Sequence, residues 1–105
     1  FFANAVTCIR KNGRVRHVSG MVNNISPWGL GIRSYSPLRK NMTTCLDLVY
    51  INSRGMKEED SVEGKVVWTS RRGDIYYAGI LFNHELNPAS QPNLFHHFNS
   101  FIRRD

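Results

Sequence analysis

Short β-type segments alternate with turn residues along residues 5–82, and this pattern limits the possible folds more than any other feature of the sequence. The segments are rich in Val, Ile, Leu and Tyr, whereas the residues between them include Gly, Pro and Asn, which form turns and end strands. No helical segment separates the strands, so we expect antiparallel pairing. The six predicted strands are Ala5–Lys11, Arg14–Ile25, Leu30–Arg33, Thr43–Ile51, Ser61–Arg71 and Ile75–Phe82.

The residues between and within these segments predict where the chain turns, bulges or forms a loop. Asn12-Gly13 predicts a two-residue hairpin, because both residue types tolerate the positive φ angles of a type I′ turn. Gly73-Asp74 predicts a second tight reversal. Gly20 interrupts the second strand, as a bulge or as a place where another backbone approaches closely. The polar segment from Asn52 to Asp60 is interpreted as a loop.

The end of the sequence changes to a helical period. Pro92 suits the first turn of a helix, and Ser90 or Gln91 could precede it as the cap. We therefore expect a C-terminal helix over residues 92–103 with one apolar stripe. The stripe consists of Leu94, Phe95, Phe98, Phe101 and Ile102.

These elements predict an all-β fold with a C-terminal helix, namely a six-stranded antiparallel β-barrel. A barrel removes the exposed strand edges that so many short strands would otherwise create. In the fifth strand, a period of two places Val66 and Trp68 on one face together with Val62 and Gly64. Trp68 is therefore either a core residue beside Val66 or an aromatic residue available to a ligand.

Length and charge narrow the class of protein. The chain has 105 residues, with 14 Lys and Arg against 8 Asp and Glu, which gives a formal charge of +6. We expect one domain over residues 1–105, with no transmembrane helix and no signal peptide. Because the first residue is not Met, we expect either a domain cut from a longer chain or a processed product. Cys8 and Cys45 are expected to be free thiols in a cytoplasmic protein, although one disulfide between them is an alternative.

No pattern of catalytic residues is present, so we expect a binding protein and no enzyme. Glu58-Glu59-Asp60 is interpreted as a solvated acidic cluster in the polar loop. His96 and His97 are adjacent on a helix, so their side chains point about 100° apart and are poorly placed to share a metal ion. His84-Glu85 is expected to lie at the surface.

The most informative short segment is Asn24-Ile25-Ser26-Pro27-Trp28-Gly29, an NxSxxG pattern. Asn24 and Ser26 are two residues apart, so both side chains point to the same side of a strand end. Gly29 allows backbone N–H groups to approach a ligand. Such a corner can bind a base edge or a phosphate, but the pattern is equally typical of an ordinary turn.

The wider sequence around this segment resembles the PilZ domain family, whose members are bacterial receptors for cyclic di-GMP. The resemblance covers almost the whole chain, in the order and spacing of its segments and the terminal helix. It rests on Val22–Ile32, with the NxSxxG pattern, on Gly64-Lys65-Val66-Val67-Trp68, and on Tyr77-Ala78-Gly79-Ile80-Leu81-Phe82. The family fold is a six-stranded barrel with a C-terminal helix.

This resemblance implies a regulatory domain that binds cyclic di-GMP and signals through a ligand-dependent contact with a protein of motility, pilus or biofilm regulation. The implied ligand-binding residues are Asn24, Ser26 and Gly29, with Trp68 as a stacking residue. Arg33, which follows the third strand near the motif, is a further candidate because its guanidinium group matches phosphate oxygens.

One departure from the family pattern leaves an alternative open. The family carries an RxxxR motif before its first strand, whereas here the first strand begins almost at Phe1. Arg10 to Arg14 matches RxxxR in letters, but it spans the first hairpin and is interpreted as coincidental. The alternative is a PilZ-like protein-interaction module that does not bind nucleotide and docks a partner through its helix or through exposed aromatic residues such as Trp28. A nucleic-acid-binding barrel is disfavoured, because the basic residues are scattered.

Overall fold

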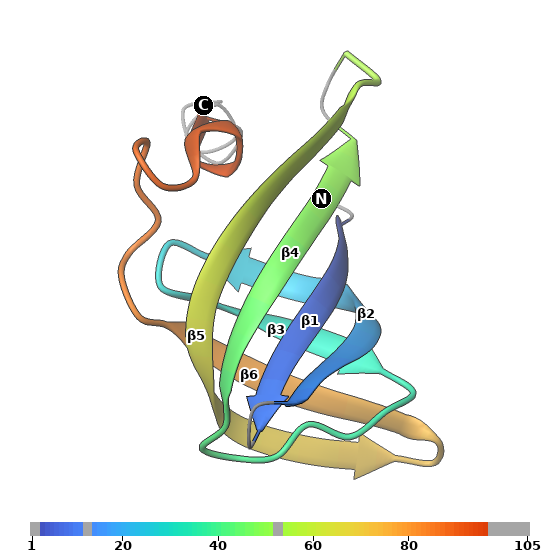
Figure 1. The fold of residues 1–105 in the computed structure, drawn as a ribbon. Helices are drawn as coiled ribbons and strands as arrows, with labels where there is room; N and C mark the ends of the chain where they lie inside the picture. Colours follow the sequence, from blue (N-terminus) through green and yellow to red (C-terminus); the bar gives the residue numbers. More distant parts are fainter. Residues whose placement is uncertain (1–2, 12–13, 52–53, 97–105) are drawn as a thin grey trace.

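The computed structural model describes residues 3–11, 14–51 and 54–96. The fold is mostly β, a strongly curled antiparallel sheet followed by a short C-terminal helix (Figure 1). The helix covers residues 92–96 within the described part of the chain. The strands are β1 (Ala3–Lys11), β2 (Arg14–Ser26), β3 (Gly29–Ser34), β4 (Thr43–Ile51), β5 (Lys57–Arg72) and β6 (Ile75–Phe82).

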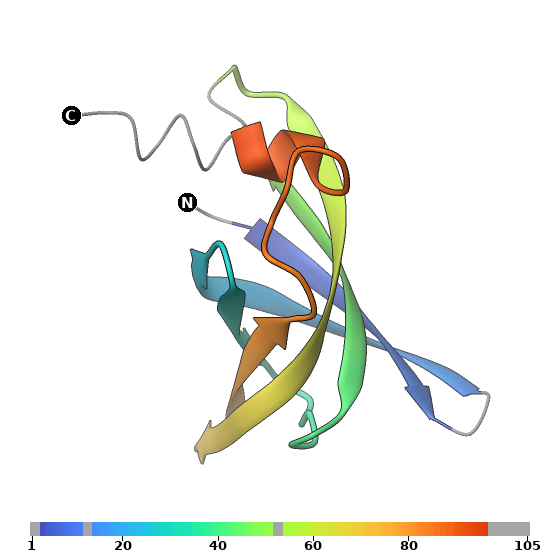
Figure 2. The same cartoon turned by 90° about the vertical axis from the view of Figure 1, so that its left-hand side faces the viewer.

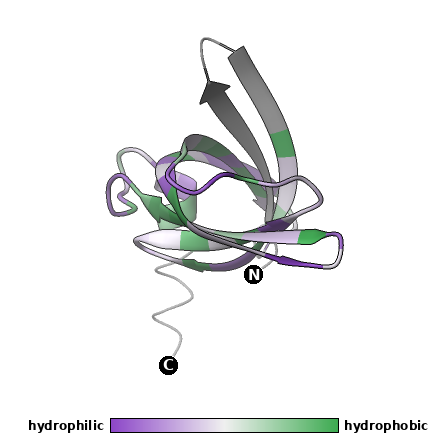
Figure 3. Cartoon of the chain, turned by 90° about the horizontal axis from the view of Figure 1, so that it is seen from below, coloured by the Kyte–Doolittle hydropathy of each residue, from purple (hydrophilic) through white to green (hydrophobic). Residues whose placement is uncertain are grey.

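The strands pair in the order β1-β2-β3-β6-β5-β4, and a ladder between β1 and β4 joins the two ends of this order. The sheet therefore closes on itself as a barrel, and the strands curve around a common axis when seen from below (Figure 3). All six pairings are antiparallel, as the alternation of strands and short connections predicts.

The predicted strand positions agree with the structure to within a few residues except at β5. β1 and β2 pair as far as Lys11 and Arg14, on either side of the predicted Asn12-Gly13 turn, which lies outside the described residues. Gly73 has a φ of 59° in the β5–β6 reversal, where a glycine is needed. At Gly20 the neighbouring strand β3 approaches closely, because a Cβ atom there would lie 2.8 Å from the Arg33 carbonyl oxygen.

The core lies inside the curled sheet and follows the alternation of side chains along each strand. In β4, for example, Leu46, Leu48 and Tyr50 point inward and are almost completely buried, whereas the residues between them are more exposed. Residues from β2, β3, β5 and β6 complete the same apolar cluster, together with Leu38, Leu86 and Leu94 from the connections and the helix.

The interpretation of residues 52–60 as a loop is wrong at its C-terminal end. β5 begins at Lys57 and pairs with β4, so Glu58, Glu59 and Asp60 lie in a strand. Glu59 is exposed, but Asp60 is only 7% exposed and points toward the core. The acidic run hides this strand in the sequence, because consecutive charged residues are untypical of strands.

Asp60 connects the sheet to the C-terminal helix. The helix begins at Pro92, as predicted, and Phe95 N–H donates to the Gln91 carbonyl. The backbone N–H of Leu94, in the first helical turn, donates to the Asp60 carboxylate and not to a neighbouring Ser or Gln side chain. This contact fixes the helix beside β5 (Figure 2), and Leu94 is completely buried. Residues 97–103 of the predicted helix, with Phe98, Phe101 and Ile102, lie outside the described residues.

The two cysteines lie on adjacent strands. The β1–β4 register places Cys8 opposite Cys45. The side chain of Cys8 is outside the described part of the structure.

Asp60 should make stability depend on pH. Burial, and then the charge of Glu58, raise the pKa of the Asp60 carboxyl above its ordinary value of 3.8. The folded state therefore binds this proton more tightly than the unfolded chain, and the resulting stabilisation is lost as pH rises through the raised pKa. Asp60→Asn keeps an acceptor for the Leu94 N–H and removes the buried charge, so we expect this variant to be more stable than the wild type at neutral pH.

Urea unfolding across a pH series measures this difference, which should narrow as the pH falls toward 3.8. Asp60→Ala is the matched control, because it also removes the charge but leaves the Leu94 N–H without this acceptor. It should be about 1–3 kcal/mol less stable than Asp60→Asn at every pH. If Asp60→Asn is less stable than the wild type at neutral pH, the buried charge of Asp60 does not destabilise the folded state, and the prediction is wrong.

Candidate functional site

Two β-bulges position the polar and aromatic residues of the candidate site. The β2–β3 register shifts between Val22 and Asn24, and the β5–β6 register shifts between Val66 and Trp68. Each shift inserts one extra residue, which reverses the direction of the side chains that follow. Val22 and Val66 therefore point into the core, whereas Asn24 and Trp68 point to the outer face.

On the outer face, four residues form one row across four adjacent strands. Asn24 of β2 pairs with Gly31 of β3, Gly31 pairs with Gly79 of β6, and Gly79 pairs with Trp68 of β5. We call these residues the Asn24–Trp68 row. The two central positions carry no side chain of their own, and all four residues line an outer hollow.

This outer hollow has a volume of about 360 Å³. Its lining comes from β2, β3, β5 and β6 and contains no charged residue. It includes the predicted site residues Asn24, Ser26, Gly29 and Trp68, together with the two central glycines. The structure therefore brings four of the five predicted ligand-binding residues to one depression.

Asn24 has a structural role in this hollow. Its Oδ1 atom accepts a hydrogen bond of 2.9 Å from the backbone N–H of Gly31. This bond fixes the orientation of the side-chain amide and leaves the Nδ2 group as a donor. Among the described residues, none accepts a hydrogen bond from this Nδ2 group.

Ser26 and Gly29 form the turn that closes one end of the hollow. The Ser26 hydroxyl accepts from the Trp28 N–H and donates to the Gly29 carbonyl, both at 3.3 Å. A Cβ atom on Gly29 would overlap the Ile80 carbonyl oxygen, so only glycine allows β3 and β6 to approach this closely. The NxSxxG pattern thus forms a turn that is stabilised by hydrogen bonds among its own residues.

The placement of Trp68 corrects the expectation from a period of two. Trp68 does not share a face with Val66, because the bulge at Val67 intervenes. Its side chain is 48% exposed, so the interpretation as a core residue is wrong. The indole lies beside the hollow, where it is available to a planar ligand.

Arg33 is the predicted site residue that does not line the hollow. It occupies the next outward position of β3 after Gly31, roughly 7 Å farther along the strand. One guanidinium nitrogen contacts the sulfur of Met21 at 3.8 Å. The side chain is exposed, so its charge can reach a ligand that extends beyond the hollow.

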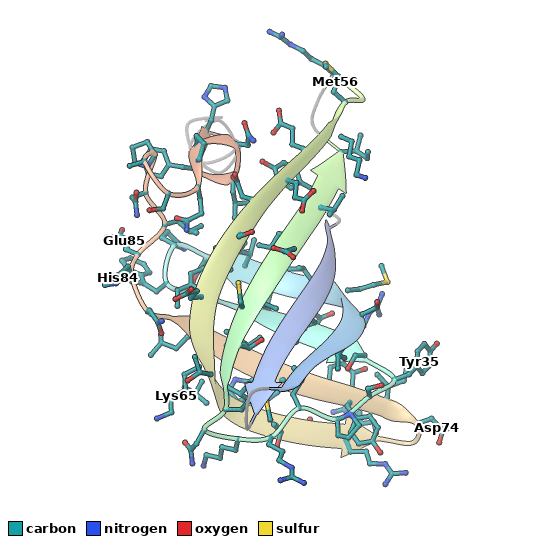
Figure 4. The ribbon with its side chains drawn as sticks, in the orientation of Figure 1. Tyr35, Met56, Lys65, Asp74, His84 and Glu85 are labelled. Atoms are coloured by element: carbon teal, nitrogen blue, oxygen red, sulfur yellow. The ribbon has the colours of Figure 1, made fainter. Side chains whose placement is uncertain are left out.

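Lys65 is a residue that the sequence analysis missed. It pairs with Leu81, which lines the hollow, and its side chain projects outward from β5 (Figure 4). Lys65 and Arg33 therefore lie on opposite sides of the Asn24–Trp68 row. The alternation along β5 places Lys65 outward, but the sequence does not show that Trp68 lies on the same face, because the bulge at Val67 comes between them.

The other residues considered in the sequence analysis do not line the hollow. Arg10 and Arg14 lie at the β1–β2 hairpin, with Arg14 ten residues from Asn24 along one strand, roughly 33 Å. His84 and Glu85 project outward after β6 (Figure 4), as predicted. Among residues 18–51 and 54–96, whose side chains the structure describes, no group of three or more His, Cys, Asp or Glu could hold a metal ion. Within the same ranges, no helix is long and apolar enough to cross a membrane.

Comparisons of the chain with protein-family models, curated proteins and solved structures found no match.

Replacing Asn24 should separate its structural role from its donor role. Asn24→Ala removes the acceptor of the buried Gly31 N–H, so we expect a loss of about 1–3 kcal/mol in the free energy of unfolding. Asn24→Asp keeps an oxygen at this place and should retain most of the stability. Urea unfolding of both variants measures these losses. Equal losses for Asn24→Ala and Asn24→Asp would show that the Oδ1 acceptor does not stabilise the fold.

Proposed function

We propose that the outer hollow binds one half of a cyclic di-GMP molecule and that the protein is a PilZ-like regulatory domain with a six-stranded barrel. The Asn24–Trp68 row carries this proposal, because it places a fixed amide donor and an exposed indole in one line beside the outer hollow. These are the groups that a guanine base requires, since it presents the acceptors O6 and N7 at one edge and a π face above and below.

The size and charge of the hollow support the same ligand. A volume of about 360 Å³ is near the lower end of the range for small-molecule pockets, so one nucleoside half enters and the other remains outside. The uncharged lining suits a neutral base. Arg33 and Lys65, on the two sides of the row, supply positive charge for the phosphates.

Calorimetric titration of the full-length protein with cyclic di-GMP tests the proposal. We expect heat of binding from the wild type and a loss of about tenfold in affinity for Arg33→Ala, because a charge-assisted hydrogen bond is removed. Asn24→Ala and Ser26→Ala should also bind more weakly, with their folding verified by circular dichroism.

Lys57→Ala is the control that matches Arg33→Ala in charge. Lys57 is exposed at the start of β5, eight residues before Lys65, so its loss should leave the affinity unchanged. Absence of binding heat from the wild type would end the proposal, and equal losses for Arg33→Ala and Lys57→Ala would show that net charge alone attracts the ligand.

A protein-interaction module without nucleotide is the second candidate, and the exposure of two apolar residues favours it. Trp28 is 58% exposed and Leu81 is 53% exposed. Both lie at the end of the hollow that the Ser26–Gly29 turn closes. Leu94 of the helix is not available to a partner, because it is packed in the core.

Under this second candidate, Trp28→Ala should abolish capture of a protein partner in a pull-down, and added cyclic di-GMP should not change capture by the wild type. Capture that increases or disappears when cyclic di-GMP is added would instead favour ligand-dependent signalling.

A further inference from the structure

The indole of Trp68 lies directly on Gly79 of the neighbouring strand. A Cβ atom built on Gly79 would overlap three atoms of the pyrrole ring, Nε1, Cε2 and Cδ1. All three nearest obstacles are atoms of this one side chain, and none belongs to the backbone. The space that a side chain of residue 79 would need is therefore filled by Trp68.

The indole lies with its face toward Gly79. Nε1 is the ring atom nearest to the built Cβ position, and its two ring neighbours are only slightly farther away and nearly equidistant. This is the pattern of a position above the ring face, and not at the ring edge. The side chain is nevertheless 48% exposed, so the opposite face of the indole is open to solvent.

The glycine on the adjacent strand is covered from the other side. A Cβ atom on Gly31 would lie 2.8 Å from Oδ1 of Asn24, and the other near atoms belong to the same amide. Asn24 and Trp68 thus extend toward each other over the Gly31–Gly79 pair, and the outer hollow adjoins both. A base entering the hollow meets the indole only on its outer face, because the sheet occupies the inner one.

We propose that Gly79 is a positioning residue, which holds the Trp68 indole flat on the sheet so that its outer face forms a preformed stacking platform for a purine base. This inference rests on the proposed function for the identity of the ligand. The position of the indole on Gly79 is a property of the free protein and can be tested alone.

Gly79→Ala is the decisive variant. Its methyl group would collide with a side chain that can rotate, so we expect the sheet to be retained and the indole to be displaced. The chain has two tryptophans, so Trp28→Phe makes Trp68 the single fluorescent reporter. In this Trp28→Phe protein, Gly79→Ala should shift the emission of Trp68 to longer wavelength and increase its quenching by acrylamide.

Gly31→Ala in the same Trp28→Phe protein is the matched control. It adds a methyl group to the other glycine of the pair, where the near atoms belong to Asn24, so the emission of Trp68 should not change. Unchanged emission and quenching in Gly79→Ala, or equal changes in both glycine variants, would overturn the assignment of Gly79 as the residue on which Trp68 lies.

Titration with cyclic di-GMP then tests the platform. Gly79→Ala and Trp68→Ala should each weaken binding about tenfold, and the double variant should lose no more than the single ones, because both changes remove the same stacking contact. Additive losses, or an affinity that survives displacement of the indole, would overturn the platform. If the wild type and the Trp28→Phe protein do not bind cyclic di-GMP, the proposed function fails, and the fluorescence comparison still decides the position of Trp68.

Discussion

One extra residue in each of two strands determines which side chains reach the outer surface, and the candidate site depends on this constraint. A regular strand would place Val66 and Trp68 on the same face, and Val22 and Asn24 likewise. The bulges keep both valines in the core and direct Asn24 and Trp68 outward. Bulges are common next to functional sites because they redirect side chains without disturbing the rest of a sheet.

The same contacts stabilise the sheet and form the hollow. Glycine within a strand costs roughly 0.5–1 kcal/mol relative to alanine, and two paired glycines would weaken β3 and β6. Asn24 and Trp68 offset this weakness by covering Gly31 and Gly79. Each covering group uses one side for the fold, namely the Oδ1 atom of Asn24 and the inner face of the indole. The other side of each group remains exposed.

Local signals were sufficient to predict most of the sheet. Turn residues and alternating apolar residues located β4 and β6 to the residue, because hairpin chemistry and burial act over short distances along the chain. The residues of the NxSxxG pattern that were predicted to bind a ligand, Asn24, Ser26 and Gly29, all line the outer hollow. Gly31 and Gly79 stand within apolar runs of the sequence, which is a signal of close approach by a neighbouring group.

Other features could not be predicted, because they depend on residues that are distant in sequence. A bulge shifts the alternation by one residue and leaves no mark in the composition, so Trp68 was assigned to the wrong face. Asp60 reads as part of a solvated acidic run, yet it accepts the N–H of Leu94, 34 residues later. A buried carboxylate that replaces a local helix cap becomes visible only when the helix is placed beside β5.

The ladder between β1 and β4 has a consequence for how the chain reaches this fold. It joins Ile9 to Thr44 and Ala3 to Tyr50, which are 35 and 47 residues apart in the sequence. Sheets dominated by such non-local pairings fold slowly, typically in milliseconds to seconds. Until the ladder forms, β1 and β4 both present unpaired backbone groups that could bind strands of other molecules. Formation of this ladder therefore removes two strand edges from contact with other molecules.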